Sequence, residues 1–307
     1  MRNLSRAPAG LVAGRAIAVA RREARGLVAA AIAVGIVVAF HDPASGPWPT
    51  GADALAYWRP SPADPYAGSA FTAPSAYLYS PAFLQALGPL RALPWEAFLA
   101  AWTVILLLAV RFLSGARLFA FGVAFAAFEI AGGNIHILLA AAIVLGFRWP
   151  AAWSFVLLTK VTPGIGLIWF AARGEWRSLA IAVGATAAIA AVSLVIAPAA
   201  WADWIGLVLA SAGRTSGTWS AVGLPLFVRL PVAVAVVTWG ARTDRRWTVP
   251  VAAMLALPAL WFGGLSMLLA AVPLLGSEAA GAVVRAGTPD GHRVPALARK
   301  RVPARST

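Results

Sequence analysis

The stretch SLAIAVGATAAIAAVSLVIAP, residues 178–198, carries no charged side chain over twenty-one residues. A straight helix needs about 20 apolar residues to cross the hydrocarbon core of a bilayer, so this stretch predicts a membrane-spanning helix. Further apolar runs follow the same pattern at 27–40, 97–113, 118–131, 135–147, 150–159, 163–172, 226–241, 247–262 and 264–276. The chain is therefore predicted to be an all-α, polytopic transmembrane protein with roughly 8–10 membrane helices. Several runs are short, which predicts broken or tilted helices around a water-filled cavity.

The composition supports this class. Of 307 residues, 61% are hydrophobic and 12% are charged, whereas a soluble domain carries about 25% charged residues. This excludes disorder and an ordinary soluble fold. The absence of cysteine also excludes disulfides, thiolate metal sites and cysteine nucleophiles.

The net charge of +14 is concentrated at the two ends of the chain. Residues 1–26 and 277–307 hold six cations each, which predicts that both termini are cytoplasmic. The charge therefore indicates orientation and contact with membrane lipids, with no nucleic-acid partner. We divide the chain into a basic N-terminus at 1–26, a transmembrane domain at 27–276 and a flexible basic tail at 277–307.

Arginines between the apolar runs give the rest of the topology. If 150–159 and 163–172 form a hairpin of two short helices, the inner arginines are Arg111, Arg117, Arg148, Arg173, Arg177, Arg242, Arg245 and Arg246. Residues 41–96, 132–134 and 199–225 are then on the outer face of a multi-pass plasma-membrane protein. An alternative for residues 1–40 is a cleaved signal peptide, because Val37-Val38-Ala39 resembles a cleavage site.

The predicted outer loop, 41–96, holds ten of the twenty-two prolines and all four tyrosines. Long loops in compact domains tend to be functional or disordered. Aromatics and prolines favour a packed substructure here, although an aromatic belt at the membrane interface explains part of the pattern. Within this loop, Asp53 could act as a general base toward a hydroxyl acceptor, or it could cap a helix over 54–58.

Lys160 is one of only two lysines and interrupts an apolar run. A lysine at such a position indicates a functional site by default. Pro163 predicts an extended residue before it and a helix end there. At the tip of a broken hairpin, Lys160 could bind an anion such as phosphate, or it could extend to the outer headgroups.

Further polar residues are predicted near the same face. Glu129 should face a cavity or a cationic partner, while Asn134 and His136 are two residues apart and so disfavour a joint metal site. Arg214 or Arg229 could supply a second phosphate contact or anchor a helix in headgroups. A transporter would place such groups near the midplane, whereas these collect at one surface.

The order of several short motifs resembles glycosyltransferase family 87, polyprenol-phosphate-mannose-dependent mannosyltransferases of the GT-C superfamily, over residues 27–215. The motifs are Gly51-x-Asp53-x-x-x-Tyr57, Asp64-Pro65-Tyr66, Tyr79-Ser80-Pro81-Ala82-Phe83, Pro89-Leu90, Leu93-Pro94, Gly133-Asn134 and Lys160-x-Thr162-Pro163. The resemblance implies a GT-C-like fold, a site on the outer face and a lipid-linked sugar as donor. It also implies that Asp53 is the base and that Lys160 contacts the donor phosphate.

The sequence therefore predicts a membrane mannosyltransferase that uses a polyprenyl-phosphate donor and a lipid- or glycan-linked acceptor, by inverting displacement. Arg214 is a second candidate for the donor phosphate, and no metal or cofactor is expected. The candidate substrate-binding residues are Tyr57, Tyr79, Glu129, Asn134 and His136. The alternative is a non-catalytic transporter or flippase of lipid-linked sugars.

Overall fold

The computed structural model describes residues 50–69, 76–211 and 224–276, together with the isolated positions 24, 26 and 28. In these parts of the chain all regular structure is helical and no strand occurs, which confirms the predicted fold class. Outside the described residues lie most of residues 1–26, most of the first predicted span at 27–40, the tail at 277–307, and Arg214.

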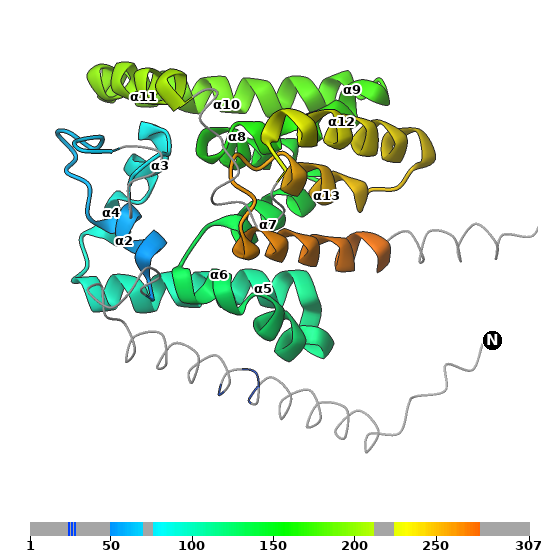
Figure 1. Ribbon diagram of the computed structural model, residues 1–307, viewed down its shortest axis with the longest axis horizontal. Coiled ribbons are helices and arrows are strands. Elements are labelled where there is room, and N and C mark those ends of the chain that lie inside the picture. Colours follow the sequence, from blue (N-terminus) through cyan, green and yellow to red (C-terminus); the bar gives the residue numbers. More distant parts are fainter. Residues whose placement is uncertain are drawn as a thin grey trace, which may run out of the picture.

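Three helices are long and apolar enough to cross a membrane: α5 (Trp95–Phe125), α10 (Trp176–Ile196) and α12 (Leu226–Thr243). They run in similar directions and define the long axis of the molecule (Figure 1). Only 11% of the most apolar 18-residue stretch of α10 is buried inside the protein. Its aliphatic side chains therefore face outward, as they would toward lipid. The protein is accordingly a multi-pass membrane protein.

Shorter helices complete the fold. Apolar ones are α7 (His136–Gly146), η1 (Pro150–Ala152) with α8 (Trp153–Thr159), η2 (Thr162–Leu167) with α9 (Ile168–Ala172), α11 (Pro198–Ser211), α13 (Thr248–Leu255) and η4 (Phe262–Ala270). The outer-loop region forms α2 (Ala52–Trp58), α3 (Pro81–Ala86) and α4 (Gly88–Arg91), and α6 (Ala127–Gly132) follows α5. Helix α11 was not among the predicted apolar runs, because two tryptophans and Asp203 interrupt its apolar residues.

Helix α5 is two helices joined at a sharp reversal. Gly115 has φ 65° and ψ 174°, a conformation available essentially to glycine alone. Beyond it the chain folds back, so that a β-carbon added at Gly122 would lie 2.9 Å from the Val110 side chain and 3.0 Å from that of Ser114. The reversal falls between the two apolar runs that the sequence separated at 113 and 118.

The hairpin predicted around Lys160 is broken at Lys160, as expected, but Pro163 has a different role than expected. Lys160 itself is extended, with φ −132° and ψ 105°, and α8 ends just before it at Thr159. Val161 already has helical dihedrals, and Pro163 lies in the first turn of η2. The prediction that Pro163 ends a helix was wrong, because proline fits the first turn of a helix, where its missing N–H costs no hydrogen bond.

Several predicted inner arginines gather at one end of the bundle. Arg173 forms an ion pair with Asp244 at 3.0 Å and donates to the carbonyl of Ala241 at 3.1 Å. The guanidinium of Arg246 lies 5.4 Å from the centre of the Phe147 ring. The helix α9 that precedes Arg173 is at the opposite end of the molecule from α2, α3 and α4 (Figure 1).

Arg229 takes neither of the two roles predicted for it, a phosphate contact or the anchor of a helix in headgroups. It binds backbone carbonyls inside the protein. It is only 3% exposed, and its guanidinium donates to the carbonyls of Leu224, Leu255, Leu257 and Pro258. These bonds tie the start of α12 to the irregular segment after α13. Arg229 therefore satisfies broken backbone at a buried position, and we exclude it from the candidate site.

Candidate active site

The short helix α2 brings Asp53 against the turn after α6. The N–H of Gly51 donates to the carbonyl of Ala131 at 2.7 Å, and Gly133 adopts a left-handed conformation with φ 73°. A β-carbon at Gly133 would lie 2.7 Å from that of Ala54, so the two segments approach closely only because residue 133 is glycine. This contact fixes α2 against the turn that follows α6.

Asp53 is not the cap of this helix, so the structural alternative considered from the sequence was wrong. Gly51 is the capping residue, in a left-handed conformation, and no side chain caps the helix. Asp53 lies in the first turn instead, and its carboxylate accepts a hydrogen bond from the Asn134 side chain. Its carboxylate is thus turned toward the residues described next.

The surroundings of Asp53 raise its pKa to about 6. Burial is the largest cause, because it disfavours the charged carboxylate, and the negative charge of Glu129 acts in the same direction. Lys160 and the hydrogen bond from Asn134 act in the opposite direction. The carboxylate therefore remains ionised at neutral pH and is more basic than an exposed aspartate.

Two tyrosines link Asn134 to the lysine. The hydroxyls of Tyr57 and Tyr79 are 3.1 Å apart, and Tyr57 also donates to Asn134 Oδ1 at 3.4 Å. The Tyr57 ring packs against Trp102, whose indole N–H donates to the carbonyl of Gly133 at 2.6 Å. The aromatic residues thus hold the 133–134 turn in place.

Glu129, His136 and Lys160 form a second arm of the cluster. His136 Nδ1 is 3.0 Å from Glu129 Oε2, and His136 Nε2 is 2.7 Å from Lys160 Nζ. The backbone N–H of His136 also donates to Glu129 Oε1. An ionised carboxylate only accepts hydrogen bonds, so we assign the ring proton to Nδ1, which leaves Nε2 to accept from the ammonium.

Lys160 connects the two arms. Its ammonium lies 5.8 Å from the centre of the Tyr79 ring, within the range of a cation–π contact. Lys160 is more exposed than the other two residues of its arm. Glu129 and His136 are 1% and 3% exposed, whereas the Lys160 residue is only partly buried, so Lys160 lies nearest the surface among these three residues.

The structure therefore brings together seven of the eight residues proposed from the sequence: Asp53, Tyr57, Tyr79, Glu129, Asn134, His136 and Lys160. The eighth, Arg214, lies outside the described residues. We call these seven residues the polar cluster. Within the described chain no group of three His, Cys, Asp or Glu side chains could hold a metal ion.

Two contributors to the site were not predicted. Trp102 supports the 133–134 turn, and the buried Ser80 hydroxyl donates to the carbonyl of Leu158. The second contact joins the outer-loop region to α8, close to Lys160. Ser80 lies in the quoted motif Tyr79-Ser80-Pro81-Ala82-Phe83, but the motif does not indicate its partner, and Trp102 has no distinguishing sequence signal.

A helical membrane bundle with carboxylates, an imidazole and an ammonium at one end of its short helices belongs to a class that contains integral-membrane transferases and transporters. A comparison with protein-family models resolves the class. Glycosyltransferase family 87 matches residues 77–284, and the chain belongs to that family. Neither the curated proteins nor the solved structures gave a match.

The matched range differs from the 27–215 inferred from motifs. It extends further toward the C-terminus, to residue 284, and it begins after Asp53 and Tyr57. Five members of the polar cluster lie inside it: Tyr79, Glu129, Asn134, His136 and Lys160. Family membership makes the protein a membrane glycosyltransferase, while the contacts of α2 join Asp53 to the matched region.

Proposed function

We propose that the protein transfers mannose from a polyprenyl-phosphate donor to a lipid- or glycan-linked acceptor, on the outer face of the plasma membrane and with both termini cytoplasmic. The observation that carries this proposal is the polar cluster. The cluster contains a basic carboxylate, Asp53, and an ammonium, Lys160, whose positive charge acts on Asp53, and this supports the proposal. These are the two groups that displacement of a sugar from a phosphate requires.

The proposed step is a single inverting displacement. An acceptor hydroxyl oxygen attacks the anomeric carbon of the donor, and the bond between that carbon and the phosphate oxygen breaks. Asp53 takes the proton from the attacking hydroxyl, and the polyprenyl phosphate leaves with the electron pair. The Lys160 ammonium stabilises the charge that develops on the phosphate.

A retaining route needs a second carboxylate about 5 Å from the first, placed to attack the sugar. Glu129 is unsuited to that role because it is buried and bonded to His136.

Glu129 and His136 are positioning residues in this proposal, in place of the direct substrate contacts expected from the sequence. Both are buried and hydrogen-bonded to one another, and His136 accepts from the Lys160 ammonium. An ammonium on a flexible four-carbon chain has many rotamers, so such a contact restricts where its charge lies. The buried Tyr57 and Tyr79 would hold Asn134 and Asp53 in place, and the half-buried Asn134 would face the sugar.

The test is sugar transfer from a mannosyl-polyprenyl phosphate by purified protein in liposomes. Asp53→Asn should lower the transfer rate by at least about 100-fold, because it removes the general base, while membrane insertion is unchanged. Glu96→Gln is the matched control, since this exposed acid lies on the neighbouring helix α5. Full transfer by Asp53→Asn would remove the mechanism. Flipping of the donor between leaflets, measured in the same liposomes and retained without any transfer by the unmodified protein, would favour a transporter.

A further inference from the structure

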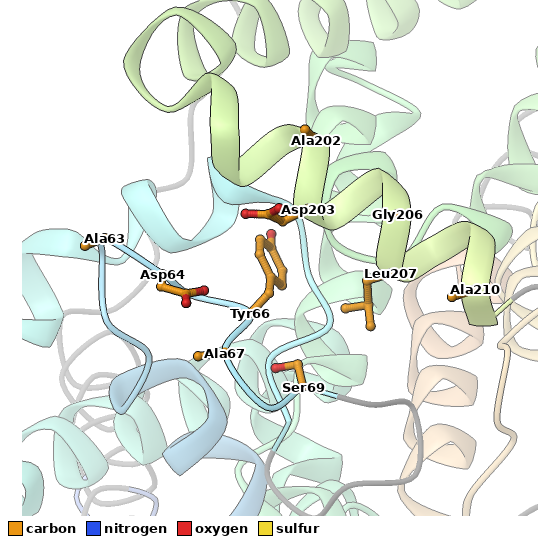
Figure 2. A pocket seen from close by; sticks show the side chains of 10 residues that line it. All are labelled: Ala63, Asp64, Tyr66, Ala67, Ser69, Ala202, Asp203, Gly206, Leu207 and Ala210. Carbon is orange, nitrogen blue, oxygen red and sulfur yellow. The ribbon is translucent and has the colours of Figure 1, made fainter.

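An open hollow of about 740 Å³ lies between the outer-loop segment 63–69 and helix α11 (Figure 2). The outer loop contributes Ala63, Asp64, Tyr66, Ala67 and Ser69, and α11 contributes Ala202, Asp203, Gly206, Leu207 and Ala210. The volume is within the range of about 300–1,000 Å³ that is usual for small-molecule sites. None of these residues belongs to the polar cluster, so the hollow is separate from the groups assigned to the chemistry.

The walls of the hollow offer oxygen atoms and no cationic side chain. Asp64 and Asp203 contribute exposed carboxylates, and Tyr66 and Ser69 contribute hydroxyls. Carboxylates accept hydrogen bonds and repel anions, which disfavours a phosphate and favours a ligand rich in hydroxyl donors. This is notable in a chain with a net charge of +14.

Helix α11 leaves room for a ligand of this kind. Ala202, Gly206 and Ala210 are four residues apart, so they share one face of the helix. That face borders the hollow, and a β-carbon added at Gly206 would meet no atom within 4 Å. Larger side chains at these positions would occupy the space.

The hollow is joined to the polar cluster through three tyrosines whose rings pack against one another at tilted angles. The Tyr66 hydroxyl donates to the carbonyl of Tyr79 at 2.7 Å. The ring of Tyr77 lies between those of Tyr66 and Tyr79, with centroid separations of 5.7 and 5.6 Å. Tyr79 in turn contacts Lys160 and Tyr57, so these three tyrosines connect the hollow to the groups proposed to react.

From this arrangement we infer that the hollow binds the uncharged, polyhydroxylated part of the acceptor, a glycan segment adjoining the sugar that is modified. The inference rests on the proposed function for its link to transfer. Asp64 and Asp203 accept hydrogen bonds from sugar hydroxyls, and the small-residue face of α11 accommodates the ring. The donor phosphate is excluded from the hollow by the same carboxylates.

The test measures binding separately from catalysis. Titration of octyl dimannoside into the detergent-solubilised Asp53→Asn protein should give saturable binding. Gly206→Leu, which fills the hollow, should weaken that binding by at least about 10-fold, a difference of about 1.4 kcal/mol. Asp64→Ala with Asp203→Ala should weaken it as well. Gly184→Leu is the matched control, because Gly184 is also a helical glycine with open space around it.

The outcomes distinguish this inference from the proposed function. The assignment of the hollow would be overturned if the Asp53→Asn protein did not bind octyl dimannoside. It would also be overturned if adding Gly206→Leu to that protein left the binding unchanged. Sugar transfer by Asp53→Asn would overturn the mechanism alone and leave the binding result standing. If transfer is active, the hollow variants should raise the acceptor KM and leave the donor KM unchanged.

Discussion

Asp53 is a carboxylate in surroundings that disfavour its charge, and this has a consequence for catalysis. Its pKa is raised to about 6 by burial and by the nearby charge of Glu129. A base of this strength is ionised at neutral pH and still accepts a proton more readily than an exposed aspartate. Under the proposed mechanism, the residues that surround Asp53 therefore set the pH range in which transfer can occur.

The rate of transfer should fall as the pH drops through about 6, since protonated Asp53 cannot accept the acceptor proton. Replacing Glu129 by glutamine removes a negative charge that raises the pKa of Asp53, so the acid limb of the pH profile should move to lower pH. The measurement is kcat/KM for the acceptor against pH in both proteins. An acid limb that stays in the same place in Glu129→Gln would contradict the electrostatic link.

At the scale of single helices, a break between two helices can require one particular residue type. The reversal in α5 depends on Gly115, whose φ of 65° and ψ of 174° suit glycine only. No neighbouring atom lies within 4 Å of the place where a β-carbon would stand. Any cost of a side chain there would thus come from the backbone and not from a clash.

Gly115→Ala should destabilise the protein by about 1–3 kcal/mol, because alanine is strained in this conformation. Gly184→Ala in α10 is the opposite case, since a helical glycine in open space gains about 0.5–1 kcal/mol when it becomes alanine. Denaturation midpoints of the two variants in mixed detergent should therefore shift in opposite directions. Equal shifts would show that the turn at Gly115 is not needed.

The buried cation of Arg229 joins two elements in a similar manner. Arg229→Met should lower the free energy of unfolding by at least about 2 kcal/mol, because the carbonyls of Leu224, Leu255, Leu257 and Pro258 lose their donor. Arg177→Met, at an exposed arginine, is the control and should change little. A loss of the same size in both would indicate an effect of net charge instead.

The sequence was sufficient for the helical class, because apolar runs of membrane length have few other interpretations. It was also sufficient to select Lys160, since a lysine in such a run is costly. It was insufficient for the role of Pro163, which lies in the first turn of a helix instead of ending one, and for Arg229, whose partners are backbone carbonyls on another element. Backbone acceptors have no signature in a sequence, so contacts of this kind are visible only in three dimensions.

Across the whole molecule, charge and helix direction agree. Two of the predicted inner arginines, Arg173 and Arg246, make contacts at the end of the molecule where α9 lies. Helices α2, α3 and α4 lie at the other end of the long axis (Figure 1). A membrane perpendicular to that axis would separate the two ends. This arrangement is consistent with the proposed orientation, in which the polar cluster faces outward.

The absence of cysteine provides a clean background for testing that orientation. Ser61→Cys, at an exposed position of the outer loop, should react with a membrane-impermeant maleimide on intact cells. Arg177→Cys, also exposed, should react only after the membrane is permeabilised. The measurement is the labelled fraction of each variant before and after permeabilisation. The reverse pattern would contradict the orientation and place the polar cluster on the cytoplasmic side.

The close approach of Gly133 to Ala54 has a consequence for natural variation in related proteins. A side chain at position 133 would collide with α2, so a homologous chain can lose this glycine only if α2 withdraws from the turn. Such a withdrawal would carry Asp53 away from Lys160. The presence of glycine at position 133 therefore distinguishes relatives that keep the Asp53 carboxylate in place from relatives that do not.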